Sequence, residues 1–122
     1  MKTPQVKVVI VGAAGYSGAE LVTWLLGHPN ASIIGLFGSG KRAESDKPTT
    51  MGDLFPRLAS RIVLEIQPAD VAEIVSLRPD VVFLATPHEA SVELAPAILK
   101  HARGDWQPRV LDLSGGFRLR DP

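Results

Sequence analysis

The chain has 122 residues, enough for one domain and too few for two ordinary ones, so we expect residues 1–122 to form a single domain. The formal net charge is zero, which argues against a nucleic acid as a partner, and no apolar run is long enough to cross a bilayer. We therefore expect a cytoplasmic protein with no membrane partner. The absence of cysteine excludes disulfides, zinc–thiolate sites and thiol catalysis by these residues.

The most informative stretch is a short apolar run that leads into a glycine-rich turn. Val6–Val11 contains five apolar residues, which predicts a parallel strand buried on both faces. A helical pattern follows over Tyr16–Leu26 and ends at Gly27 and Pro29. This order brings backbone N–H groups close to a dinucleotide pyrophosphate and points the positive end of the helix dipole at it. The residues that we expect to bind the cofactor here are Gly12, Ala14, Gly15, Tyr16, Ser17 and Gly18.

The glycine spacing is an extended variant of the common G-x-G-x-x-G fingerprint. Aligned on Gly18, the chain has Ala13-x-Gly15-x-x-Gly18, with Gly12 one place earlier than usual. The alternative is a tight strand-to-helix turn that uses glycines without holding a ligand. The strand before the turn and the helix after it favour dinucleotide binding.

Strand and helix patterns alternate along the rest of the chain. This alternation predicts an α/β fold with a Rossmann-like, doubly wound parallel sheet in a single three-layer α/β/α domain. The expected elements are a strand at 32–37, a long irregular loop at 38–60, a strand at 62–66, a helix at 69–77, a buried strand at 81–85, a helix at 89–101 and a last strand at 110–113.

The helix expected at 89–101 has an apolar stripe that is interrupted by a proline. Its stripe consists of Val92, Ala95, Ile98 and Leu99. Pro96 lies inside the pattern, which predicts a kink or a break into two short helices.

The loop after the second strand indicates which dinucleotide is bound. NAD-binding proteins usually place a carboxylate there for the ribose 2′-hydroxyl. This chain has no Asp or Glu between Glu20 and Glu44, and it offers Ser39 with Lys41 or Arg42 instead. A hydroxyl and two cations suit a 2′-phosphate, so we expect NADP rather than NAD. The alternative is that Lys41 and Arg42 are solvated loop charges.

Polar residues also follow the two last strands, where ligands of such sheets bind. We expect the backbone of Thr86 to face the nicotinamide ribose and Pro87 to direct the chain there. His88 is either a proton carrier or a capping residue, and Arg118 is either an anion ligand or a surface arginine. The Asp112 carboxylate is expected to accept hydrogen bonds from backbone N–H groups.

These residues together resemble the amino-terminal, NADP-binding part of N-acetyl-gamma-glutamyl-phosphate reductase. The resemblance rests on residues 12–21, 81–88 and 112–119 and extends over nearly the whole chain. It implies reduction of an acyl phosphate to an aldehyde with NADPH in arginine biosynthesis, through a cysteine thioester and an assisting histidine. The family usually reads Ser-Ala-Asp-Phe-Arg where this chain has Gly116 in place of the acidic residue, so no role is carried over to that position.

The resemblance places the nucleophilic cysteine and its histidine beyond Pro122. We therefore assign no catalytic or metal-binding residue to this chain. We expect an excised cofactor domain or the product of a truncated gene, inactive alone. The acyl-phosphate substrate and a homo-oligomeric assembly are expected of the full-length enzyme. The alternatives are the cofactor domain of an aspartate-semialdehyde dehydrogenase and a free-standing, non-catalytic NADP-binding module.

Overall fold

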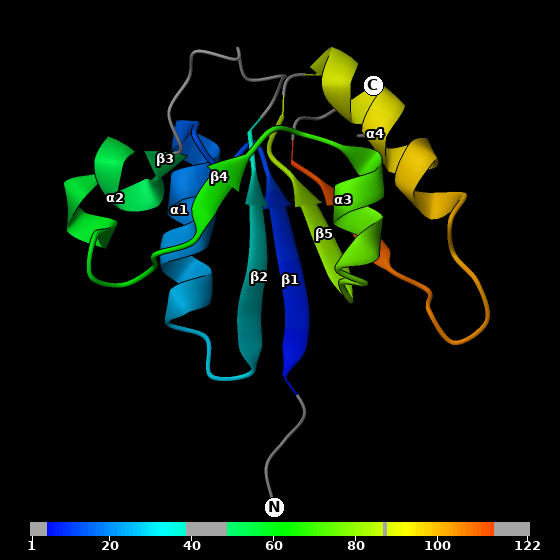
Figure 1. Cartoon of the computed structure of the whole chain (residues 1–122), viewed down its shortest axis with the longest axis horizontal. Coiled ribbons are helices and arrows are strands. Elements are labelled where there is room, and N and C mark those ends of the chain that lie inside the picture. Colours follow the sequence, from blue (N-terminus) through cyan, green and yellow to red (C-terminus); the bar gives the residue numbers. More distant parts are fainter. Residues whose placement is uncertain (1–4, 39–48, 87, 114–122) are drawn as a thin grey trace, which may run out of the picture.

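Six strands form one sheet in the spatial order β3-β4-β2-β1-β5-β6 (Figure 1). The computed structural model describes residues 5–38, 49–86 and 88–113. Neighbouring strands run parallel, except that β3 and β4 are antiparallel. The strands are β1 (Val6–Val11), β2 (Ala31–Phe37), β3 (Thr49–Thr50), β4 (Glu65–Gln67), β5 (Val81–Leu84) and β6 (Arg109–Asp112).

Helices cover both faces of this sheet. Side chains alternate along β1, so Val8 and Ile10 join one core cluster while Val9 and Val11 join the other. The first cluster packs under α1, α2 and η1, and the second packs under α3 and α4. This arrangement confirms the predicted three-layer fold with a doubly wound sheet. The helical segments are α1 (Tyr16–Leu26), α2 (Met51–Leu54), the 3₁₀ turn η1 (Pro56–Leu58), α3 (Val71–Ser76) and α4 (His88–Leu99).

The direction of winding reverses beside β1, the central strand. The last residue of β1, Val11, lies opposite Phe37 at the end of β2 and Leu84 at the end of β5. Figure 1 shows the three arrowheads at one edge of the sheet, where α1 and α4 begin. We call this the carboxyl edge. Ligands of doubly wound sheets bind in the crevice where the strand order reverses, which here lies between the ends of β1 and β5.

Trp106 is buried at the opposite edge of the sheet, where the strands begin. Its indole N–H donates to the carbonyl of Pro79 at 2.8 Å, and the Arg78 guanidinium lies 5.7 Å from its ring centre. The side chain is only 8% exposed. Pro79 lies just before β5 and Trp106 just before β6, so this contact joins the amino ends of these two strands. It is therefore remote from the carboxyl edge.

The predicted irregular loop at 38–60 is wrong for residues 49–58, which form β3, α2 and η1. A capping box starts α2: the Thr50 hydroxyl accepts from the Asp53 N–H at 3.3 Å, and the Asp53 carboxylate accepts from the Thr50 N–H at 2.9 Å. A Cβ on Gly52 would lie 2.5 Å from the Ala59 Cα. This segment is therefore folded tightly on itself.

Two further sheet predictions need correction. The strand expected at 62–66 is β4, which spans only Glu65–Gln67. Ile62 packs in the core without joining the sheet, because its N–H donates to the Leu58 carbonyl at 3.2 Å after η1. The sheet is also not wholly parallel, since β3 returns antiparallel along β4.

The buried side of α4 differs from the predicted stripe. Ala95 and Ile98 are buried as expected, whereas Val92 and Leu99 are 41% and 46% exposed. Ser91, one turn before Ala95, takes the remaining place on the buried side and is fully inaccessible. The helix therefore turns one polar side chain toward the sheet at its first turn.

The helix α4 continues through Pro96, so the predicted break into two helices is wrong. Proline removes the hydrogen bond to the carbonyl four residues earlier, at Val92. Pro96 and Val92 both lie on the exposed side of the helix, where water can replace the lost donor.

We predict that Asp70→Ala lowers the free energy of unfolding by about 1 kcal/mol, because Asp70 caps α3. Its carboxylate accepts from the N–H groups of Ala72 and Glu73, at 2.9 and 3.4 Å. Urea unfolding measures the change. Asp70→Asn keeps an accepting oxygen and should stay close to the unmodified chain. An equal loss for both variants would contradict the capping role.

Candidate functional site

The turn between β1 and α1 is held by backbone hydrogen bonds. The Phe37 carbonyl at the end of β2 accepts from the N–H groups of Gly12 at 2.7 Å and Ala13 at 3.0 Å. The Gly15 N–H then donates to the Gly12 carbonyl at 3.2 Å. The path of the turn is therefore set by main-chain groups of two neighbouring strands.

Two glycines of the turn are required by close packing. Gly12 has a φ of +88°, and a Cβ there would lie 2.5 Å from the Ala85 carbonyl oxygen at the end of β5. A Cβ on Gly18 would overlap the Gly12 carbonyl oxygen and lie 2.7 Å from the Ala13 Cα. Both residues are buried. They let α1 pack directly against the strand ends.

The amino end of α1 presents unpaired N–H groups beside this turn. Gly15 is the N-cap residue, and no side chain caps the helix. Within the described backbone, no carbonyl accepts from the N–H groups of Tyr16, Ser17 and Gly18. Residues 14–17 are exposed, and the first turn of the helix carries no acidic residue. Such a helix end carries a partial positive charge and can bind an anion such as a pyrophosphate.

The end of β5 lies on the other side of the place where ligands of such sheets bind. The Ala85 N–H donates to the Val11 carbonyl at 2.8 Å, which continues the pairing with β1 up to the turn. Thr86 is only 3% exposed, and its hydroxyl oxygen lies 2.6 Å from the Ser91 hydroxyl oxygen on α4. The Thr86 side chain is therefore turned toward α4, and its backbone borders the turn.

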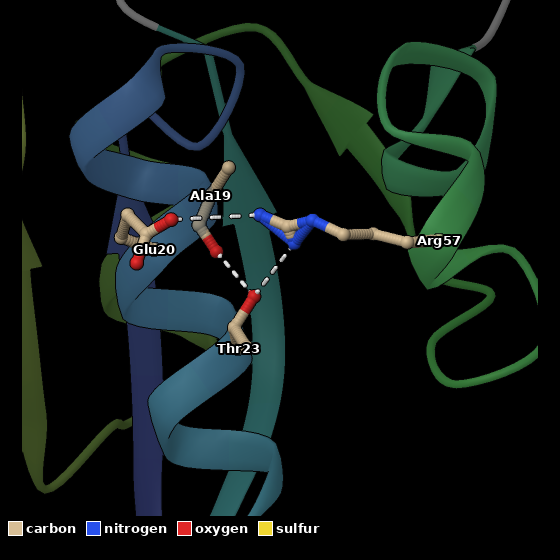
Figure 2. A network of polar contacts seen from close by, with 4 residues as sticks. All are labelled: Ala19, Glu20, Thr23 and Arg57. Atoms are coloured by element: carbon tan, nitrogen blue, oxygen red, sulfur yellow. Dashed lines mark hydrogen bonds and ion pairs between the residues drawn. The ribbon is translucent and has the colours of Figure 1, made fainter.

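Figure 2 shows how η1 is joined to α1 through Arg57. One guanidinium nitrogen lies 3.7 Å from the Glu20 carboxylate, and the other donates to the Thr23 hydroxyl at 3.3 Å. That hydroxyl donates in turn to the Ala19 carbonyl at 2.9 Å. The Arg57 and Glu20 side chains are 49% and 68% exposed, so the ion pair contributes about 1 kcal/mol at most.

Aromatic contacts join the same segment to the first turn of α1. The Phe55 ring meets the Tyr16 ring edge-on, with 6.4 Å between the ring centres. The Arg57 guanidinium lies 6.0 Å from the centre of the Phe55 ring. Tyr16 is nevertheless 87% exposed, so most of its ring remains open to solvent beside the helix end.

Several predicted site residues are not placed by the structure. The part of the chain that it describes omits Ser39, Lys41, Arg42, Pro87 and Arg118, and also the side chain of His88. Asp112 ends β6, and the expectation that its carboxylate accepts from backbone N–H groups stays a prediction.

Metal binding and membrane crossing find no support in residues 5–38, 49–86 and 88–113. No three His, Asp or Glu side chains there are grouped so that they could hold a metal ion. None of the helices there is both long and apolar enough to cross a bilayer.

The sequence matches a known protein family. A family model described as "Semialdehyde dehydrogenase, NAD binding domain" matches residues 7–122. The chain belongs to this family. The exposed helix end at the glycine turn therefore belongs to a domain of the NAD-binding type that this family model describes.

Similar proteins confirm the resemblance stated from the sequence. The chain is 47% identical over 114 residues to N-acetyl-gamma-glutamyl-phosphate reductase of Yersinia pestis and 44% identical over 114 residues to that of Escherichia coli K12. It is 41% identical over 118 residues to the reductase of Pseudoalteromonas atlantica. These alignments cover 93–95% of this chain and 32% of each relative. The chain thus spans about a third of the length of these relatives.

A solved structure confirms the Rossmann-type fold. Aspartate semialdehyde dehydrogenase from Candida albicans, determined with NADP, superposes with a TM-score of 0.55 at 20% identity. The match covers 88% of this chain and 29% of that one.

Two features of the site are absent from the sequence prediction. One is the contact of Phe55 and Arg57 with the first turns of α1. The spacing of Thr50 and Asp53, which is that of a capping box, is the signal that reveals a helix there. The other is Ser91 beneath Thr86, whose helical spacing from Ala95 places it on the buried side of α4.

We predict different effects on stability for alanine at the two ends of α1. Gly18→Ala forces a Cβ into backbone atoms and should lower the free energy of unfolding by about 1–3 kcal/mol. Gly27→Ala is the control: its Cβ would lie 3.6 Å from the Trp24 carbonyl oxygen, an ordinary contact, so stability should hold or rise. Urea unfolding compares them. A Gly18→Ala variant as stable as the Gly27→Ala variant would show that the packing at the turn is not tight.

Proposed function

We propose that the chain binds NADP(H) as the cofactor domain of an N-acetyl-gamma-glutamyl-phosphate reductase. The observation that carries this proposal is the uncapped amino end of α1, held beside the ends of β1 and β5 by Gly12 and Gly18. A dinucleotide pyrophosphate supplies the negative charge that such a helix end favours. The names of the similar reductases support the choice of parent enzyme.

The residues of the turn divide into two roles in this proposal. Gly12 and Gly18 are buried and shape the backbone, whereas residues 14–17 are exposed and face the ligand. Among these exposed residues, Tyr16 and Ser17 have N–H groups without a described carbonyl partner, and these bind the pyrophosphate oxygens. The Thr86 backbone and Pro87 border the nicotinamide ribose on the other side of the crevice.

The adenosine side of the site distinguishes NADP from NAD in this proposal. Ser39 with Lys41 or Arg42 binds the 2′-phosphate, since the chain has no carboxylate there for a free 2′-hydroxyl. The Candida albicans enzyme, which shares the fold, was determined with NADP.

The parent reaction is the reduction of an acyl phosphate to an aldehyde, for which bound NADPH supplies the hydride. The chain contains no cysteine, so a thioester step needs a thiol from outside these residues. We infer that residues 1–122 form one cofactor domain, inactive alone, within a larger homo-oligomeric enzyme of the cytoplasm.

An aspartate-semialdehyde dehydrogenase is the second candidate parent. The likeness to the Candida albicans structure favours it at the level of the fold. The identities of 41–47% to the reductases favour the arginine pathway, because they extend over 93–95% of the chain.

We predict that the chain binds NADPH about 10-fold to 100-fold more tightly than NADH, because a charge-assisted contact to the 2′-phosphate contributes about 1.5–3 kcal/mol. Isothermal titration calorimetry measures both affinities. The double variant Lys41→Ala/Arg42→Ala should weaken NADPH binding and leave NADH binding unchanged. Equal affinities for both dinucleotides in the unmodified chain would overturn the assignment of the 2′-phosphate.

We predict that Gly15→Val abolishes dinucleotide binding while the chain stays folded. Gly15 is exposed, has a φ of −86°, and a Cβ there meets only the Gly12 carbonyl oxygen, at 3.7 Å. The fold therefore accepts a side chain that fills the space in front of the helix end. Circular dichroism and calorimetry test the two halves of this statement. Gly27→Val, at the far end of α1, is the matched control and should bind normally. Continued binding by Gly15→Val would place the pyrophosphate elsewhere.

A further inference from the structure

Two buried hydroxyl groups lie directly behind the crevice. Thr86 and Ser91 are 3% and 0% exposed, and they are the buried polar side chains of the described residues. Thr86 follows the end of β5, and Ser91 lies in the first turns of α4. Their position behind the carboxyl edge makes them candidates for a role in the site.

The hydroxyl groups of Thr86 and Ser91 are hydrogen-bonded to each other. Their oxygens are 2.6 Å apart, and the Ser91 hydroxyl also lies 3.5 Å from the Thr86 carbonyl oxygen, a long hydrogen bond. Both hydroxyl protons have an acceptor if Thr86 donates to Ser91 and Ser91 donates to the Thr86 carbonyl. This arrangement holds both the side chain and the carbonyl of Thr86 against α4.

Stability alone does not require this pair. A buried hydrogen bond contributes only modestly to net stability, and replacing both partners with apolar groups of similar shape is nearly neutral. Valine and alanine would fill the same space. A packed apolar contact, however, would fix the direction of the Thr86 side chain less strictly than its 2.6 Å hydrogen bond to Ser91 does.

The backbone that the pair holds touches the glycine turn. A Cβ on Gly12 would lie 2.6 Å from the Ala85 carbonyl carbon and 3.0 Å from the Thr86 nitrogen. The Ala85 N–H is bonded to the Val11 carbonyl at 2.8 Å. A displacement of residues 85 and 86 by a few tenths of an ångström would therefore change the spacing between the end of β5 and the glycine turn at this point.

We propose that Thr86 and Ser91 are positioning residues for the nicotinamide half of the cofactor. Ser91 acts through Thr86: the hydroxyl pair fixes the backbone of residues 85 and 86 on the β5 side of the crevice. The adenosine half lies on the β2 side and does not depend on the pair. This inference rests on the proposed function, since it presupposes a dinucleotide across the turn.

Isothermal titration calorimetry on the 122-residue chain separates the two halves of the cofactor. The ligands are NADPH and 2′-phospho-ADP-ribose, which lacks the nicotinamide. The variants are Thr86→Val, Ser91→Ala, the double variant Thr86→Val/Ser91→Ala, and Thr86→Ser, which keeps the hydroxyl. Ser76→Ala is the matched control, since it removes an exposed hydroxyl that donates to the Glu73 carbonyl at 2.7 Å, far from the carboxyl edge.

We expect Thr86→Val and Ser91→Ala to weaken NADPH binding about tenfold and to leave 2′-phospho-ADP-ribose binding unchanged. Thr86→Ser should retain most of the NADPH affinity. The double variant should recover the urea midpoint of the unmodified chain, because no buried hydroxyl is left without a partner, yet it should still bind NADPH weakly. It also keeps the test decisive if a single variant fails to fold.

Three results would overturn the inference: unchanged NADPH affinity in the double variant, an equal loss for both ligands, or a loss for Ser76→Ala as large as for Ser91→Ala. If the unmodified chain binds neither ligand, the proposed function fails, and the inference fails with it. If it binds both and the variants match it, the proposed function stands and the positioning role alone is wrong.

Discussion

The close approach of backbone to backbone at Gly12 and Gly18 is the constraint on which the site depends. Gly12 lies against the end of β5, and Gly18 brings the first turn of α1 against Gly12. A methyl group at either position would separate the helix from the strand ends. The helix end could then no longer face the crevice between β1 and β5, and Thr86 would lose the neighbour that its backbone borders. The position of the α1 amino end, and of the partial positive charge it carries, thus depends on glycine at positions 12 and 18.

The parts of the fold that the sequence predicts are those governed by local periodicity and by glycine. The bounds of β1 and α1 agree with the structure, because a run of branched apolar residues followed by Gly12 allows few other arrangements. The strand expected at 81–85 is β5, which is one residue shorter and ends at Leu84. The end of β5 lies beside the glycine turn, as expected. Parallel pairing follows from the alternation of elements, so the sequence also predicts that a ligand site would lie at the carboxyl edge.

Features set by contacts between distant segments were not predictable in this way. Residues 49–58 contain Gly52 and Pro56 and are predicted to be a loop, yet Thr50 and Asp53 cap a short helix. The turn after this helix places Arg57 next to Glu20 on α1. Ser91 is polar, so apolar periodicity assigned Val92 to the buried side of α4 instead. Buried hydroxyl groups are usually hydrogen-bonded, and the partner of Ser91 is Thr86, which lies outside α4. The periodicity of α4 alone therefore does not reveal it.

The position of Trp106 has a practical consequence for fluorescence. The chain has two tryptophans: Trp24 is 76% exposed on α1, and Trp106 is buried at the amino ends of the strands. Unfolding moves only Trp106 from an apolar environment into water, so the shift in emission wavelength reports the loss of the global fold. Because Trp106 lies at the edge opposite the glycine turn, a ligand at the turn does not touch it. The change in emission wavelength on unfolding therefore comes from Trp106, while Trp24 is already exposed in the folded chain and changes little.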